Sequence, residues 1–162
     1  MTKFSLAVLL FFAVPIGVLA QKVSETRKYS SMLGKQVACN SNPKAGKLLM
    51  ELSRKRFISK TYVVQDSISY YRLKRPMSVL GFNPAAVFGF QQGYDNFFLR
   101  SPGTAPPEMV GIITRDSVSS AKTKLSKLGL KNVRVEEHLY NLAGNVNRSK
   151  KKFVEIMCWE RH

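Results

Sequence analysis

The chain has 162 residues, which fits one domain with a modest core. It carries 26 Lys and Arg against 10 Asp and Glu, a net charge of +16. That excess excludes a near-neutral surface and implies attraction to anionic partners, because a small domain stays soluble with a charge magnitude of about 2–8. With two histidines and two cysteines, the composition gives no metal-ligand cluster, and no cofactor-binding motif is present.

The first twenty residues have the pattern of a secretory signal peptide. Lys3 supplies a positive start, an uncharged apolar run covers 4–18, and compact residues stand three before and one before a cut after Ala20. The apolar run is shorter than the ~20 residues of a membrane-spanning helix, so cleavage is favoured over anchoring. We therefore expect a secreted or periplasmic protein that begins at Gln21.

The two cysteines stand near the two ends of the mature chain. In an oxidising compartment Cys39 and Cys158 are expected to form a disulfide. In the loop-entropy model a loop of that size stabilises the fold by about 4–5 kcal/mol. The competing hypothesis, a nucleophilic Cys39 activated by Lys35 and Lys47, has no supporting motif.

Residues 21–37 are polar and basic without an evident period. We expect a flexible basic lead-in there, followed by a single domain over 38–162 that the terminal disulfide closes. A helix is predicted at 43–56. Asn42 suits its N-cap and Pro43 its first turn, and apolar residues then recur at helical spacing.

The next segments are rich in β-branched and aromatic residues. Residues 61–64 and 67–71 predict two strands, as a hairpin or one bulged strand. The segment 81–107 contains five phenylalanines and many Gly and Pro residues, without a clean period. It is core, an exposed aromatic binding surface, or a contact inserted into a membrane. Core is favoured, because the rest of the domain holds few large apolar residues.

The last third of the chain predicts a strand–helix–strand segment. A buried strand at 109–114 precedes a helix that Asp116 or Ser117 caps and Gly129 ends, and an alternating strand follows at 133–139. A final strand covers 153–159. The expected fold class is α+β: two helices packed on a four- to six-stranded mixed sheet that contains one β-α-β unit.

The main functional hypothesis is an exported, non-catalytic basic protein that docks on an acidic protein or anionic polymer. Basic residues would steer association and aromatic residues would anchor the partner. For a bacterial source, this predicts a periplasmic inhibitor, an immunity-type protein or an envelope accessory protein. An anionic membrane surface and nucleic acid are further candidate partners. The candidate binding residues are Arg72, Lys74, Arg75, Phe90, Tyr94 and Arg100.

The alternative hypothesis is a secreted ribonuclease-like or toxic effector enzyme. Glu136 and His138 would face the same side of their strand as an acid–base pair, with Arg134 as a phosphate clamp. The simpler explanation is the solvated face of a half-buried strand, which alternation alone predicts. Asn147 begins a glycosylation acceptor pattern that has meaning only in a eukaryotic source.

Overall fold

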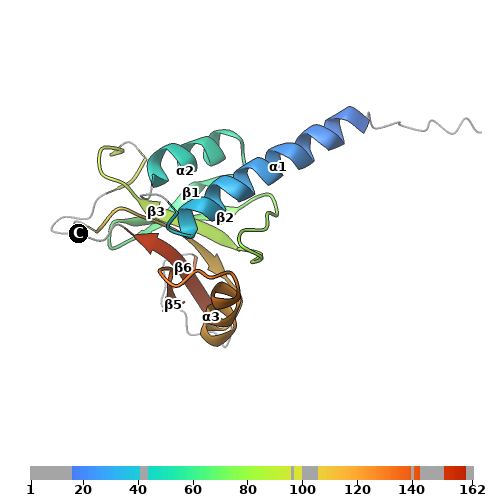
Figure 1. The fold of residues 1–162 in the computed structure, drawn as a ribbon. Coiled ribbons are helices and arrows are strands. Elements are labelled where there is room, and N and C mark those ends of the chain that lie inside the picture. The colour runs from blue at the N-terminus through green and yellow to red at the C-terminus, as the bar shows by residue number, and fades with distance from the viewer. Residues whose placement is uncertain are drawn as a thin grey trace, which may run out of the picture.

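A computed structural model describes residues 16–40, 44–95, 97–99, 106–139, 141–142 and 152–159, with the backbone alone for 16–20 and 159. The described residues form three helices and one six-stranded sheet (Figure 1). The helices are α1 (Ile16–Val37), α2 (Ala45–Arg54) and α3 (Val118–Lys127). The α+β class is confirmed, with one helix more than the sequence predicted.

The sheet is antiparallel throughout, which corrects the expected mixed sheet. Its strands lie in the order β1-β2-β3-β4-β6-β5. They are β1 (Ile58–Gln65), β2 (Ile68–Leu73), β3 (Ala86–Phe90), β4 (Met109–Thr114), β5 (Arg134–His138) and β6 (Phe153–Trp159). The predicted hairpin is β1 and β2.

The expected β-α-β unit is interrupted by the last strand. β4 and β5 run in the same direction on either side of α3, but β6 lies between them and pairs antiparallel with both. Ser117 caps α3 as predicted, since its side chain accepts a hydrogen bond from the Ser120 N–H. Gly129 ends the helix with a φ of 71°. Local signals therefore located α3 correctly, while the insertion of β6 depends on pairing between distant segments.

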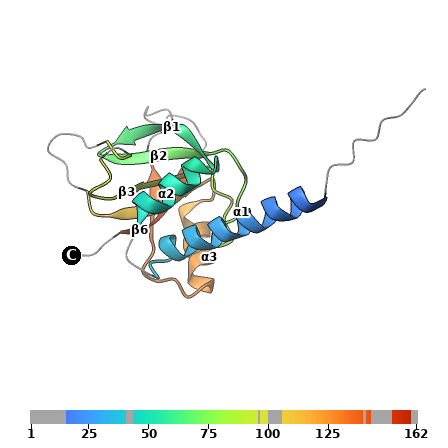
Figure 2. The same ribbon diagram turned by 90° about the horizontal axis from the view of Figure 1, so that it is seen from above.

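All three helices cover the same face of the sheet (Figures 1 and 2). Directly paired residues of an antiparallel sheet project to one face, which places Gly89, Val135 and Cys158 on a common side. α2 packs over Gly89, where a Cβ would lie 2.9 Å from the Ala45 side chain. α3 lies beside Val135, and the end of α1 is bonded to Cys158.

The expected flexible lead-in at 21–37 is wrong, because these residues are most of α1. Tyr29, Leu33 and Val37 lie four residues apart on one side of the helix and are at most 1% exposed. The domain core therefore begins inside α1 and not at residue 38. The N-terminal part of α1 extends beyond the body of the domain (Figures 1 and 2).

The predicted disulfide is confirmed. Cys39 and Cys158 are bonded with a Cα–Cα distance of 5.2 Å and a sequence separation of 119. Cys39 follows α1 directly, and Cys158 lies on β6. The bond therefore fixes the C-terminal end of α1 on the sheet.

The aromatic segment at 81–107 contributes several phenylalanines to the hydrophobic core. Phe82 and Phe88 are fully buried and Phe98 is 1% exposed. Phe97 is partly buried and stacks on Tyr71, with ring centroids 5.2 Å apart. The preference for core over an exposed aromatic surface is thereby confirmed for these rings.

The face of the sheet opposite the helices curls over itself. Tyr70 on β2 stacks on Phe88 and also contacts His138 on β5, with ring centroids 5.5 Å apart, although three strands separate β2 from β5. Such a contact requires a strongly twisted sheet. The Phe88 ring lies over Gly111, where a Cβ would come within 2.3 Å of the ring. Gly111 thus leaves the room that the ring needs.

We predict that Gly111→Ala lowers the free energy of unfolding by about 1–3 kcal/mol, because the new methyl group overpacks the space under Phe88. Denaturant titration measures the change. Gly34→Ala on α1 is the matched control: its Cβ would lie 3.6 Å from Leu80, and alanine favours the helix by up to about 1 kcal/mol. Equal effects of the two substitutions would contradict this account of Gly111.

Tyr29 joins α1 to α2, since its hydroxyl donates a hydrogen bond of 2.8 Å to Glu51. Burial, reinforced by that bond, raises the pKa of Tyr29 to about 12. An unfolded tyrosine has a pKa of ~10, so this contribution to stability is complete below pH ~10 and falls as pH rises towards 12. We predict that the stability difference between wild type and Tyr29→Phe shrinks over this interval in denaturant titrations. A difference that stays constant would contradict the assignment.

Candidate functional site

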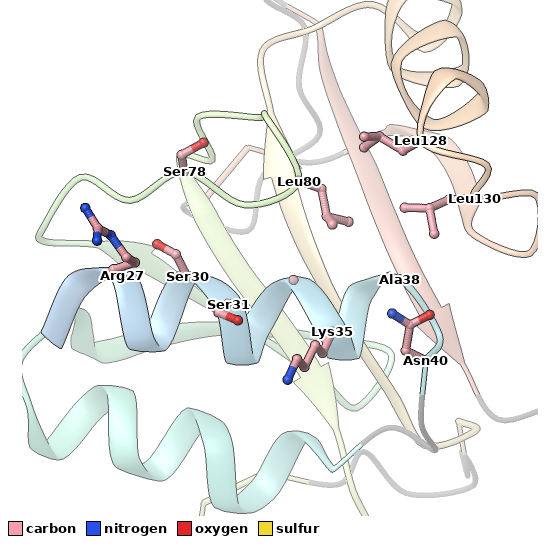
Figure 3. Close-up of a pocket in the computed structure, with 11 residues that line it drawn as sticks. Arg27, Ser30, Ser31, Lys35, Ala38, Asn40, Ser78, Leu80, Leu128 and Leu130 are labelled. Atoms are coloured by element: carbon pink, nitrogen blue, oxygen red, sulfur yellow. The ribbon is translucent and has the colours of Figure 1, made fainter. Parts of the chain in front are cut away.

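A groove of about 460 Å³ runs along one side of α1 (Figure 3). Its floor consists of small residues of α1 and of the residue that follows it, among them Ser30, Gly34 and Ala38. The opposite wall comes from two separate segments of the chain, which supply Ser78 with Leu80 and Leu128 with Leu130. A second hollow of about 480 Å³ shares Arg27, Ser30 and Ser78 with the groove and continues it towards Lys22.

The wall above Gly34 is a tight turn with an unusual residue. Val79 and Phe82 exchange two backbone hydrogen bonds of 2.9 Å, and Leu80 and Gly81 between them have φ angles of 53° and 76°. Positive φ at both central residues defines a type I′ turn, which normally takes Asn-Gly. A leucine there costs of order 1–3 kcal/mol in backbone strain. Its side chain faces Gly34 of α1, where a Cβ would lie 3.6 Å from the leucine.

Positive charge borders this groove. Arg27 and Lys35 line it and are exposed, and Lys22 lines its continuation. None of the described residues that line the two hollows is acidic. Glu25, also on α1, instead pairs with Lys55 and Arg75, and the Lys55 hydrogen bond lowers the pKa of its carboxyl group. The groove therefore attracts anions without an internal carboxylate to compensate its charge.

The apolar part of the groove lies at the C-terminal end of α1. Leu128 is 54% exposed, which is unusual for a large aliphatic side chain, and Leu130 beside it is half-buried. In Figure 3 both leucines lie beyond Leu80, on the side away from Arg27 and Ser78. The leucines thus gather at one end of the groove and Arg27, Ser30 and Ser78 at the other. Asn40 and Lys35 also line the leucine end, and the Lys35 side chain points away from the leucines (Figure 3).

The binding residues predicted from the sequence do not gather at this groove. Arg72 and Lys74 are exposed on and just after β2, while Arg75 lies over the Phe57 ring at 4.7 Å and pairs with Glu25. Tyr94 is half-buried against the Gly46 backbone of α2.

The prediction that Phe90 anchors a partner is wrong. Phe90 is 4% exposed and belongs to the core, so a partner cannot reach its ring. Arg100 and Asn147 lie outside the described residues.

The groove could not be predicted from the sequence, because its floor is formed by small side chains along α1 and not by a recognisable motif. The recurrence of Ser30, Gly34 and Ala38 at helical spacing was the available signal.

The residues of the enzymatic hypothesis have other partners than expected. Arg134 and Glu136 form an ion pair with each other. His138 is 5% exposed, and its Nδ1 lies 2.7 Å from a Glu155 carboxylate oxygen on β6. The Tyr70 hydroxyl donates a 3.1 Å hydrogen bond to the same oxygen. An acid–base pair of Glu136 and His138 is therefore not formed in this arrangement.

The Tyr70–Glu155–His138 cluster joins three strands on the curled side of the sheet. Burial and the neighbouring carboxylate raise the pKa of Tyr70, which keeps its hydroxyl a donor. The Nε2 atom of His138 is buried without a hydrogen-bond partner. Tyr70 and His138 are at most 6% exposed, and their shared contact with Glu155 links β2, β5 and β6, which makes the cluster a cross-strand support in this fold.

We predict that Glu155→Ala lowers the free energy of unfolding by about 2–4 kcal/mol, because it leaves the buried His138 and Tyr70 donors without their acceptor. Denaturant titration again measures the change. Glu137→Ala is the control, since that carboxylate forms an exposed pair with Lys152 and its loss should cost at most about 1 kcal/mol. A Glu155→Ala protein as stable as the control would refute the supporting role.

The described residues contain no group of three or more His, Cys, Asp or Glu side chains placed to hold a metal ion. Among the helices of the described segments, none combines the length and apolar character needed to cross a membrane.

Neither a family model, nor a curated protein, nor a solved structure matches this chain. The groove beside α1 is thus interpreted from its own geometry and charge.

Proposed function

We propose that this chain is an exported, non-catalytic binding protein that docks on an acidic protein through the basic groove beside α1. The observation that carries the proposal is the groove itself: cations border it, hydroxyl groups and leucines line it, and its described lining holds no carboxylate. A concave surface with a few polar groups and apolar walls is the usual form of a binding site.

The surface beyond the groove supports the same proposal. Many exposed cations make no ion pair with a described carboxylate. Examples on α1 and α3 and in the loop after α3 are Lys22, Arg27, Lys28, Lys35, Lys122, Lys127 and Lys131. Such a field accelerates association with an anionic partner and disfavours basic partners.

Export is supported by two independent features. The leader at 1–20 has the composition of a cleaved signal, and its removal takes away one lysine, which leaves a net charge of +15. The Cys39–Cys158 bond belongs to an oxidising compartment. A periplasmic inhibitor, an immunity-type protein or an envelope accessory protein fits this combination of export, disulfide closure and a basic docking surface.

We predict that the mature protein binds polyglutamate at low ionic strength and loses at least about tenfold in affinity between 0.05 M and 0.5 M salt, because screening shortens the range of the attraction. Fluorescence anisotropy of labelled polymer measures the affinity, with polylysine as the negative control. Equal affinity at both salt concentrations, or binding of both polymers, would contradict electrostatic docking.

A further inference from the structure

We infer that the groove beside α1 binds an extended polypeptide segment in which acidic residues are followed or preceded, within about five positions, by aliphatic residues. This inference rests on the proposed function and specifies the partner's recognition segment. The acidic side chains lie against Arg27, where Lys22 in the continuation of the groove adds to the attraction, and the aliphatic ones lie against Leu80, Leu128 and Leu130.

The order of side chains along the groove selects this occupant. Lys22, Arg27 and the hydroxyl of Ser78 lie towards the N-terminal end of α1, while Leu128 and Leu130 lie beyond its C-terminal part (Figure 3). A uniformly acidic chain would leave the exposed Leu128 without an apolar contact, and an apolar chain would leave the cations without a counter-charge. A segment with both kinds of residue in blocks satisfies the whole groove.

The length of the groove sets the spacing. Arg27 and Ala38 both line it, and eleven helical residues span about 16 Å. An extended chain rises ~3.3 Å per residue, so about five residues cover the same length. The blocks of acidic and aliphatic residues in the partner must therefore be nearly adjacent, with two or three residues in each.

Leu80 is the second observation that points to binding. An asparagine at this position would suit the type I′ turn better, yet the chain places a half-buried leucine there, at the centre of the groove wall. Strained residues concentrate at ligand contacts, where their placement serves recognition. Leu80 stands between Arg27 on one side and Leu128 and Leu130 on the other (Figure 3), and so marks the junction of the two blocks in the partner.

The test measures binding of two labelled peptides of identical composition to the disulfide-closed mature protein. In the block peptide, three glutamates precede three leucines, and in the alternating peptide the same residues alternate. We expect the block peptide to bind at least about tenfold more tightly, because only its order matches the groove. Anisotropy titrations at one fixed ionic strength compare the two peptides, and vesicles of anionic lipid are measured alongside.

Two variants test the groove directly, and a third serves as their control. Arg27→Glu and Leu80→Asn should each remove most of the preference for the block peptide. Leu80→Asn should do so with little change in stability to denaturant, since the better fit of asparagine to the turn offsets the lost packing of the half-buried leucine. Lys60→Glu is the matched control: Lys60 is an exposed residue of β1 outside the groove lining, and its change in net charge equals that of Arg27→Glu. It should weaken both peptides alike and keep the preference.

The outcomes separate this inference from the proposed function. Equal binding of the two peptides, or equal effects of Arg27→Glu and Lys60→Glu, would overturn the groove inference while salt-sensitive binding of polyglutamate still supported the proposed function. Binding of anionic vesicles without binding of either peptide would overturn both, in favour of a membrane surface. A preference for the block peptide that is lost in Leu80→Asn and retained in Lys60→Glu would establish the groove.

Discussion

The attachment of α1 to the sheet is the constraint on which the rest of the structure depends. Tyr29, Leu33 and Val37 bury one side of the helix in the core, and the Cys39–Cys158 bond fixes its end on β6. The neighbouring side of α1, with Ser30, Gly34 and the adjoining Ala38, is then held opposite the turn at Leu80, and the space between them is the groove. Without this attachment, the same residues would form a flexible basic segment, and no concave surface would exist.

The attachment of α1 by the disulfide and the core also offsets the repulsion between the many cations of this chain. Several acidic side chains already have partners within the chain: Glu25 pairs with Lys55, Glu51 accepts a hydrogen bond from Tyr29, and Glu155 accepts one from Tyr70 on the curled side of the sheet. The cations therefore dominate the surface, and their mutual repulsion opposes folding. A disulfide that spans 119 residues and a buried aromatic core offset this repulsion, so that the fold tolerates its high net charge.

The two polar sites of the fold serve opposite purposes. Around His138, polar groups are buried: its Nδ1 and the Tyr70 hydroxyl share Glu155, and the imidazole contacts aromatic rings on both sides. Around Arg27, polar groups are exposed and line a hollow. Hydrogen bonds enclosed in this way stabilise a fold, whereas exposed groups beside a concave apolar wall remain available to a partner. This contrast is why the groove, and not the histidine, is the better candidate for function.

The sequence by itself determined the features that depend on local chemistry or on composition. The Ser117 cap, the Gly129 stop, the β1–β2 hairpin, the pairing of the two cysteines and the burial of the aromatic segment were all predictable, because each follows from neighbouring residues or from the shortage of alternatives. Only the tertiary structure decided the place of β6 between β4 and β5, the His138–Glu155 contact, the helical state of 21–37 and the groove that results. The physical reason is that these features arise where distant segments meet. Tyr29, Leu33 and Val37 give α1 about one buried apolar residue per turn, which is too weak a pattern to predict a helix from the sequence. The helix becomes stable when the sheet covers these side chains.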